Sequence, residues 1–308
     1  MILCAGEALI DMLPRSTTDG ENAFAPYAGG AVFNTSIALG RLGCPVGLFT
    51  GLSKDLFGDV LVETLAASNV DSSLAARSDR PTTLAFVKLV DGQASYAFYD
   101  ENTAGRMLTE ADLPSLDQSD VTALFFGGIS LVVEPCAEAY AALCERESNS
   151  RVIMMDPNVR QGFITDEAAY RARLDRMLGC CDIVKVSDED LAWIVGNDDL
   201  DAAVDSLLNK GVSLVCLTEG ADGATARTKE FGVKVVAHKV EVVDTVGAGD
   251  TFNAGVLAGL QDAGALSKDG LRTLSPEIAK AALELGVQAA AVTVSRAGAN
   301  PPTRDELS

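Results

Sequence analysis

The chain has 308 residues and is 48% hydrophobic, which is long enough for a large α/β domain and too apolar for a disordered protein. Its formal net charge of −20 argues against nucleic acid and anionic membranes as partners, because both would be repelled. His238 is the only histidine, which excludes zinc sites built on several histidines and Ser-His-Asp catalysis around any other histidine.

Seven cysteines are scattered along the chain without a CxxC spacing, which predicts reduced and mostly buried thiols. We find no basic leader and no apolar segment long enough to span a bilayer. These features together predict a cytoplasmic protein.

The first 67 residues are predicted to contain two strands and two helices. An apolar run over residues 2–10, interrupted by Gly6 and Glu7, predicts a central strand that ends at Asp11. Residues 14–28 are polar and are predicted to be irregular. Gly29-Gly30 then opens a helix to about residue 42, a strand follows over residues 46–52, and Asp55 caps a helix over residues 57–67.

Residues 82–90 and 94–99 have a different texture from the rest of the chain. Apolar and polar residues alternate in both segments, which are also rich in β-branched and aromatic residues. Because Asp91-Gly92 joins them, they predict a β-hairpin. A hairpin inserted in a series of strands and helices is a plausible lid. We therefore expect a small hairpin lid formed by segments at about 12–28 and 80–104.

The remaining pattern mostly alternates strands with helices. Strands are predicted at 123–126, 152–156, 183–186 and 214–217, helices at 136–147, 167–178, 188–195, 202–209 and 276–291, and an antiparallel pair at 224–228 and 233–238. This order predicts an α/β fold, with a doubly wound, mostly parallel sheet flanked by helices in a single domain over residues 1–308.

One stretch, VEVVDTVGAGDTFNAGVLAG at residues 240–259, combines features that suggest chemistry. It is predicted to run from a buried strand through a glycine turn into a helix, where exposed N–H groups and the helix dipole would form an anion cradle. Asp250 lies inside this cradle and would repel a resting phosphate. It could instead accept a proton from an attacking hydroxyl while the amides stabilise a phosphoryl group.

The same stretch also allows simpler interpretations. A tight strand–helix turn capped by Asp250 would need no ligand. A dinucleotide fingerprint is disfavoured because Phe252 occupies the place of the third glycine, and no GxxxxGK[ST] segment occurs in the chain.

The string DTVGAGDTF resembles the C-terminal signature of the ribokinase-like (PfkB) carbohydrate kinases, usually DTTGAGDxF, with Val246 in place of a threonine. Four further motifs of that family follow in the same order along the chain. They are Gly29-Gly30 with Asn34, Lys185 to Asp190 at the place of the NxxE motif, Thr218-x-Gly220-x-x-Gly223, and a last helix followed by Arg296-Ala297-Gly298-Ala299. The resemblance covers the whole chain and implies a ribokinase-like fold and an ATP-dependent sugar kinase.

The resemblance also implies roles for individual residues. Asp250 would be the base, and the amides of Gly247, Ala248, Gly249 and Asp250 would form the anion hole. Asp11, Gly29, Gly30 and Asn34 would hold the sugar hydroxyls, for which short polar side chains are suitable. Taken alone, Asp11 could equally cap a strand end, and Asn34 could be a polar surface residue of a helix.

The nucleotide and cation sites follow from the other motifs. Residues expected to contact ATP are Lys185, Ser187, Thr218, Gly220, Gly223 and Asn253. The NxxE motif organises Mg²⁺ in the family, and here Ser187 and Asp190 replace its Asn and Glu, so Asp190 or Glu189 would act through water. The alternative is an acidic first helical turn. A monovalent cation such as K⁺ is expected beside Asp244 and the Val246 carbonyl.

Two segments resemble particular branches of the family. The DPNVR sequence at 156–160 is similar to the DxNxR stretch of fructokinases and 2-keto-3-deoxygluconate kinases, so Arg160 could reach the transferred phosphate, although a surface ion pair is the alternative. The segment from Tyr96 to Arg106 resembles the FYxENxA segment of bacterial fructokinases. Tyr99 and Arg106 would close over the sugar, or the aromatic residues would only pack the lid.

The function implied by these resemblances is phosphorylation of fructose to fructose 6-phosphate by in-line transfer from ATP. A 2-keto-3-deoxygluconate kinase is the alternative within the family, and it would need extra cations such as Arg106 for the substrate carboxylate. A non-catalytic sugar sensor on the same fold is the other alternative, suggested by the replacements at Ser187 and Asp190. The exposed edge of a lid hairpin favours a homodimer.

Overall fold

The computed structural model describes residues 1–90, 93–196 and 199–307. Within these residues the main sheet has nine strands in the order β15-β14-β13-β12-β11-β10-β1-β4-β6. The strands are β1 (Ile2–Ala5), β4 (Val46–Phe49), β6 (Val70–Asp71), β10 (Ala123–Gly127), β11 (Val152–Asp156), β12 (Ile183–Ser187), β13 (Leu214–Thr218), β14 (Ala224–Arg227) and β15 (Gly232–Val235). In this order, each of β6, β4, β1, β10, β11 and β12 pairs in parallel with the next strand, ending at β13. The strand β14 pairs antiparallel with both β13 and β15. The predicted doubly wound, mostly parallel sheet is confirmed.

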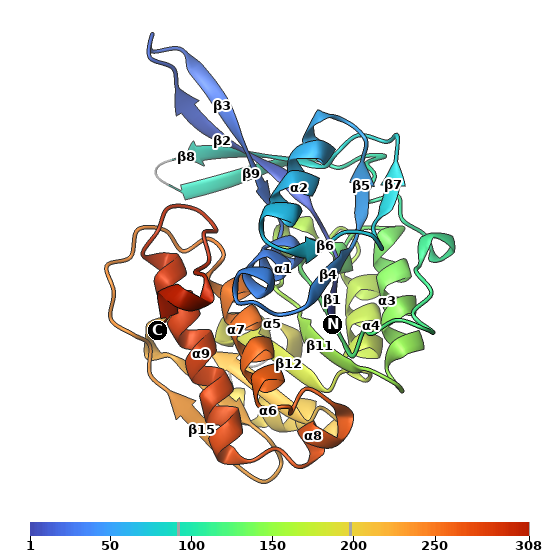
Figure 1. Ribbon diagram of the computed structural model, residues 1–308, viewed down its shortest axis with the longest axis vertical. Helices are drawn as coiled ribbons and strands as arrows, with labels where there is room; N and C mark the ends of the chain where they lie inside the picture. Colours follow the sequence, from blue (N-terminus) through green and yellow to red (C-terminus); the bar gives the residue numbers. More distant parts are fainter. Residues whose placement is uncertain (91–92, 197–198, 308) are drawn as a thin grey trace.

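Helices cover both faces of this sheet (Figure 1). One layer contains α1 (Ala31–Arg41), α2 (Leu56–Ala67), α7 (Ala248–Asp262), α8 (Lys268–Arg272) and α9 (Pro276–Val294). The other contains α3 (Cys136–Glu147), α4 (Glu167–Leu178), α5 (Asp188–Val195) and α6 (Leu200–Asn209). Among the described residues, no helix is long and apolar enough to cross a membrane.

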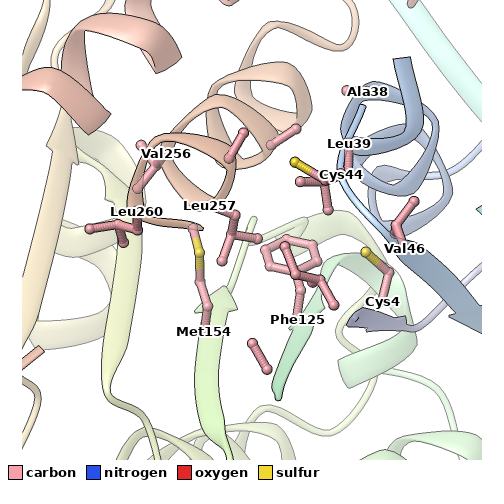
Figure 2. Packing of buried hydrophobic residues seen from close by; sticks show 14 of the residues in the cluster. Cys4, Ala38, Leu39, Cys44, Val46, Phe125, Met154, Val256, Leu257 and Leu260 are labelled. Carbon is pink, nitrogen blue, oxygen red and sulfur yellow. The ribbon is translucent and has the colours of Figure 1, made fainter. Parts of the chain in front are cut away.

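The alternation of side chains along each central strand supplies both layers of the core. In β1, Ile2 and Cys4 pack toward α1 and α7, whereas Leu3 and Ala5 pack on the opposite face. Figure 2 shows the first of these layers, where Phe125 of β10 and Met154 of β11 lie beneath Leu257 and Leu260 of α7. Because both faces are apolar, these strands appear in the sequence as continuous apolar runs.

A second sheet of four strands, in the order β3-β2-β8-β9, projects from the top of the molecule in Figure 1. It consists of β2 (Leu9–Ser16), β3 (Asn22–Gly29), β8 (Leu84–Val90) and β9 (Gln93–Tyr99). We call it the lid sheet. The predicted hairpin over residues 82–99 is present as the antiparallel pair β8 and β9. Its predicted turn, Asp91-Gly92, lies outside the described residues.

The prediction for residues 2–28 was wrong in two respects. The apolar run is two strands: β1 joins the main sheet, the chain leaves it at Gly6 and Glu7, and β2 begins in the lid sheet at Leu9. Residues 14–28 are ordered, because β2 and β3 pair antiparallel from Leu9 with Gly29 to Ser16 with Asn22. The lid sheet has much of its surface in solvent, so its strands need few apolar residues and resemble a loop in composition.

Residues 46–52 were also predicted as one strand and are divided. The main sheet takes β4, whereas β5 (Gly51–Ser53) pairs in parallel with β7 (Ala76–Ser78) in a separate two-stranded sheet. The apolar run continues through the break because Phe49 and Leu52 are both fully buried. Burial alone therefore does not reveal where the chain changes sheets.

The predicted buried strand at residues 240–243 is absent. Val242 is 61% exposed and Val243 is 59% exposed, and the amides of Val243 and Asp244 donate to the carbonyl of Val294 at the end of α9. The strand β15 ends at Val235, and residues 240–243 form no strand of the sheets that the described residues contain. The glycine turn before α7 is therefore reached from a surface loop.

Glycines bring α7 and α9 into close contact. A Cβ atom added at Gly255 would lie 2.5 Å from the Cα atom of Gly286, and one added at Gly259 would lie 2.6 Å from the Cα atom of Ala282. Neither neighbour can move away without separating the two helices. This packing therefore fixes the position of α7, whose N-terminus carries the glycine turn.

We expect Gly255→Ala to lower the free energy of unfolding by about 1–3 kcal/mol, because the added methyl group overpacks the α7–α9 contact. Urea unfolding followed by circular dichroism measures this. Gly162→Ala is the matched control, since no atom lies within 4 Å of a Cβ there, and it should change stability by less than about 0.5 kcal/mol. Equal effects of the two substitutions would contradict the role given to this contact.

Candidate active site

The N-terminus of α7 forms a cradle of backbone amides at the carboxyl edge of the main sheet. Gly247 is the N-cap residue and has φ 78°, in the left-handed region that favours glycine. A Cβ atom there would also lie 2.8 Å from the Cβ of Ala299. The amides of Gly249 and Asp250 follow in the first turn, where an α-helix leaves N–H groups without an intrahelical acceptor. This turn is therefore suited to an anion.

Asp250 is buried in this turn and is held by α1. Its Oδ2 atom accepts a hydrogen bond of 2.9 Å from Nδ2 of Asn34, and its carbonyl accepts one of 3.2 Å from Oγ1 of Thr35. The pKa of Asp250 is raised to about 7, chiefly by burial; the carboxylates of Asp156 and Glu7 also raise it, whereas Asn34 and Lys185 lower it. A carboxylate with this pKa is able to take up a proton near neutral pH.

A cavity of about 350 Å³ opens in front of Asp250. Its lining includes ten of the residues predicted from the sequence. These are Asp11, Gly30, Asn34, Arg160, Lys185, Val246, Gly247, Ala248, Gly249 and Asp250. They come from the lid sheet, α1, β12, α7 and the loop after β11, so the fold gathers distant segments around one space. The other predicted residues lie outside this lining.

Asp11 and Gly29 are diagonal neighbours in the β2–β3 pair, where Gly29 is opposite Leu9 and Asp11 is opposite Tyr27. Burial raises the pKa of the Asp11 carboxyl to about 6. A side chain at Gly29 would collide with the Oδ2 atom of Asp11, so glycine leaves the room that this carboxylate occupies. Asp11 lines the cavity, whereas Gly29 acts only by being small.

A buried network of polar side chains supports the floor of the cavity. Oδ2 of Asp156 accepts from Nζ of Lys185 at 2.9 Å and from Nδ2 of Asn253 at 2.8 Å, and all three residues are at least 94% buried. A Cβ atom at Gly249 would lie 3.2 Å from Nζ of Lys185, so the ammonium sits beside the first turn of α7. Asn253 is thus engaged with Asp156 beneath the cavity.

The loop after β11 is fixed by two carboxylates. The amide of Asn158, which has φ 45°, donates to Oδ1 of Asp156 at 3.1 Å, and the amide of Val159 donates to Oδ2 of Asp190 at 3.2 Å. Burial and the neighbouring Asp156 raise the pKa of Asp190. Arg160 follows at the exposed end of this loop and lines the cavity.

The lid contributes Phe98 to the cavity rather than Tyr99. Successive side chains of a strand point to opposite faces, and Tyr99 is accordingly 62% exposed with its ring against the edge of Phe86. The ring of Phe98 contacts that of Phe163 at a centroid distance of 4.4 Å. Because Phe163 follows the loop after β11, this contact joins the lid sheet to the main body across the cavity.

Arg106 lies behind the cavity. Its Nη1 atom pairs with Asp100 at 3.0 Å and its Nε atom donates to the carbonyl of Glu134. It lines a second cavity of about 30 Å³, which shares Glu7 and Ile129 with the first. The guanidinium charge is therefore already matched by a carboxylate.

The residues predicted for the nucleotide and Mg²⁺ follow two neighbouring strands at the same edge. Ser187 ends β12 and caps α5 by accepting from the amide of Asp190 at 3.1 Å, and Glu189 is exposed in the first turn. Thr218 ends β13, and the turn at Gly220 and Gly223 follows it. Gly223 has φ 100° and approaches the carbonyl of Val235 too closely for a side chain. No group of three metal-ligating side chains occurs within the described residues.

Asp244 ties two loops together beside the α7 turn. Its Oδ1 atom accepts from the amide of Val246 at 3.0 Å, and its Oδ2 atom accepts from the amide of Gly298 at 2.9 Å. Val246 is 46% exposed and lines the cavity. The residues predicted around a monovalent cation are therefore neighbours in space.

Two carboxylates of the site were not predicted from the sequence. Glu7 is half-buried between the two cavities, and Asp156 is the centre of the network below them. The available signals were an acidic residue inside the apolar run at 2–10 and an acidic residue at the end of the strand at 152–156. Neither signal identifies the hydrogen-bond partners of the carboxylate, because those partners lie far away in the sequence.

Comparisons with known proteins identify similar sequences and structures. A family model described as pfkB family carbohydrate kinase matches residues 1–306. A fructokinase from Rhizobium leguminosarum bv. trifolii is 58% identical over 277 residues, which covers 90% of this chain and 85% of that protein. Probable fructokinase-7 from Arabidopsis thaliana is 30% identical, covering 100% and 91%. The crystal structure of a fructokinase from Xylella fastidiosa with bound ATP has a TM-score of 0.89 at 30% identity, covering 99% and 96%.

We expect Lys185→Met to lower the free energy of unfolding by about 3–5 kcal/mol, because it leaves the buried Asp156 carboxylate without its cation. Chemical denaturation measures the change. Lys210→Met is the control: its pair with Asp175 is substantially exposed, so its loss should cost less than about 1 kcal/mol. A Lys185→Met protein as stable as the control would contradict the importance of this pair.

Proposed function

The chain belongs to the pfkB family of carbohydrate kinases, and we propose that it transfers the γ-phosphoryl group of ATP to fructose, giving fructose 6-phosphate. The observation that carries this proposal is Asp250, a buried carboxylate of raised pKa at a helix N-terminus, facing a cavity lined by Asp11 and Asn34. The identity of 58% to a fructokinase supports fructose as the acceptor.

In the proposed reaction, fructose lies between the lid sheet and α1. Asp11 and Asn34 present acceptors and donors to vicinal hydroxyls, and the backbone at Gly30 allows close approach. Asp250 accepts the proton of the attacking hydroxyl, with its carboxylate oriented by the hydrogen bond from Asn34. General-base assistance of this kind contributes about 10²–10⁴-fold to the rate.

The charge that develops on the phosphoryl group would be stabilised from two sides. The amides of Gly247 to Asp250 and the dipole of α7 act from the helix side, together with the ammonium of Lys185. Arg160 acts from the loop after β11. These groups are held in place before the reaction, so little reorganisation is needed in the transition state.

ATP is proposed to extend from the α7 turn over the carboxyl ends of β12 and β13, past Ser187, Thr218, Gly220 and Gly223. Asp190 and Glu189 offer hard oxygen atoms suited to Mg²⁺ held through water, which would neutralise charge on the ATP phosphates. Asp244 and the Val246 carbonyl offer the oxygen atoms expected of a K⁺ site. Asn253, being engaged with Asp156, would support Lys185 rather than touch the nucleotide.

The lid sheet is proposed to close over the sugar and exclude water, which would otherwise accept the phosphoryl group. The contact between Phe98 and Phe163 supports this role because it joins the lid to the main body across the cavity.

The two edge strands of the lid sheet carry aromatic side chains that are 46–62% exposed. They are Phe24 and Tyr27 on β3 and Tyr99 on β9. We propose that a second copy of the chain covers this surface in a homodimer.

We place the protein in the cytoplasm, since its cysteines are unpaired and all but Cys180 are buried.

The surroundings of Arg106 argue against a 2-keto-3-deoxygluconate kinase. That substrate has a carboxylate, and the lid cation expected to bind it is paired with Asp100 outside the main cavity. A non-catalytic sugar sensor is disfavoured because the base, its orienting amide and the anion cradle are all assembled. Phosphorylation of fructose therefore fits the site best.

A coupled assay of ADP release tests the assignment. Fructose, 2-keto-3-deoxygluconate, ribose and nucleosides are compared as acceptors, and kcat/KM for fructose should exceed the others by about 100-fold or more. A preference for the keto acid would overturn the substrate. Binding of sugar and ATP without ADP release would overturn the enzyme activity itself.

Replacing Asp250 by Asn should lower kcat by about 10²–10⁴-fold, because the amide keeps the shape but accepts no proton. Isothermal titration calorimetry should show that ATP still binds, since the backbone cradle is unchanged. Near-normal turnover by this variant would show that another group removes the proton.

The activity should also depend on pH through Asp250. The base must be ionised to act, and its pKa is about 7, so kcat/KM should fall as the pH decreases below this value, approaching about tenfold per pH unit. A pH–rate profile at subsaturating fructose measures this. A profile that stays flat down to the ordinary pKa of an aspartate would contradict the raised value.

A further inference from the structure

Glu7 is a half-buried carboxylate that the proposed reaction does not use. It lies where the chain leaves the main sheet after β1, and it lines both the main cavity and the smaller cavity behind it. Desolvation raises its pKa, whereas hydrogen bonds from Ser130 and Ala31 lower it. A carboxylate in such surroundings is costly to bury unless its oxygen atoms are satisfied.

The two oxygen atoms of Glu7 accept from two different helix N-termini. Oε1 accepts from the amide of Ala31, the first residue of α1, at 2.9 Å. Oε2 accepts from the amide of Ser130, in the 3₁₀ helix Gly128–Leu131 that follows β10, at 3.3 Å. The N-terminus of α1 offers an N–H group and a partial positive charge, and the short 3₁₀ helix offers the amide of Ser130, so one carboxylate joins the two elements.

Glycines make room for this bridge. Gly128 has φ 69°, and a side chain there would collide with the Glu7 carboxylate. Gly30 has φ 109°, and a Cβ atom on it would lie 3.0 Å from the Glu7 carbonyl and 3.1 Å from its Cγ atom. The backbones of both partners thus approach Glu7 more closely than other residues allow.

Glu7 is connected to Asp250 through the first turn of α1. Ala31 begins α1 and Asn34 lies three residues later, so an amide held by Glu7 fixes the turn that carries Asn34. Asn34 in turn donates to Asp250 at 2.9 Å. We propose that Glu7 is a positioning residue of the kinase. By accepting hydrogen bonds from α1 and from the 3₁₀ helix, it holds these two elements together, and we call this arrangement the clamp. The clamp keeps Asn34 and the adjoining wall of the sugar cavity in place against Asp250.

A glutamate is required for this clamp. Glutamine has a single oxygen acceptor, and its NH₂ group would face one of the two amides. Aspartate is one carbon shorter, so its oxygen atoms would not span the two helices. The proposal rests on the sugar kinase function, because the consequence of a misplaced Asn34 is read in phosphoryl transfer.

The test compares Glu7→Gln, Asn34→Ala and the double variant in the ADP-release assay, using whichever sugar the wild-type enzyme phosphorylates best. Failure of the proposed function would then appear in the wild-type enzyme, and failure of this inference only in the variants. We expect Glu7→Gln to lower kcat/KM for the sugar by about tenfold or more, because one hydrogen bond to a charged group is lost. The KM for ATP should stay within about twofold.

The double variant distinguishes positioning from direct contact. If Glu7 acts through Asn34, the double variant should be no more than about twofold worse than Asn34→Ala alone, since coupled residues are not additive. Fully additive losses would overturn the proposal, because they would mean that Glu7 acts on the sugar independently of Asn34.

Glu147→Gln is the matched control. Glu147 is only 5% exposed and pairs with Arg146 and Arg151 at the end of α3, away from both cavities. It should lower the melting temperature with little change in kcat/KM. If Glu7→Gln resembles this control, with a lower melting temperature and unchanged kinetics, Glu7 is structural and the proposal fails.

A second variant covers the case that Glu7→Gln does not fold. Ala31→Pro removes the N–H that Oε1 accepts and leaves Glu7 in place, and proline is well tolerated at the first position of a helix. It should reduce kcat/KM for the sugar by about tenfold with the KM for ATP nearly unchanged, again through loss of one charge-assisted hydrogen bond. Wild-type kinetics in a folded Ala31→Pro enzyme would overturn the clamp.

Discussion

The burial of one carboxylate at the N-terminus of α7 is the constraint on which the active site depends. In the proposed mechanism Asp250 must be ionised to work as a base, yet burial opposes its charge, and its pKa is raised to about 7. The helix dipole, Asn34 and Lys185 offset part of this cost. Each of these groups acts only if α7 is held in place, and the glycine contact between α7 and α9 provides that support.

The topology explains why so few polar groups suffice. Parallel strands present their carboxyl ends at one edge, and β1, β10, β11 and β12 are consecutive neighbours there. Asp156 and Lys185 thus meet below the α7 turn although 29 residues separate them. The lid sheet is attached at the same edge, because the chain leaves β1 at Gly6 and starts β2 at Leu9, which brings Asp11 to the cavity.

The sequence predicts best what depends on neighbouring residues. The helix at 136–147 and the strand at 152–156 have their predicted bounds, since periodicity and buried apolar runs are local signals. Residues 14–28 were missed because their strand character comes from pairing within a solvated sheet. The valines at 240–243 misled for the opposite reason: they are apolar but exposed. Glu7 could not be assigned from sequence, because its partners are amides 24 and 123 residues away.

The negative net charge of the chain makes it difficult to bind a phosphate at this site. A protein of net charge −20 must bind a triphosphate, yet its site adds the carboxylates of Asp11, Asp250, Glu7 and Asp156. Asp156 is matched by Lys185, and Glu7 by two helix N-termini, so their charges are largely compensated. Asp11 and Asp250 remain, and the charge of Asp250 opposes a resting anion in the cradle. In the proposed mechanism that repulsion disappears when Asp250 takes the hydroxyl proton, at the moment when charge builds on the phosphoryl group. The cradle therefore favours the transition state over a bound phosphate.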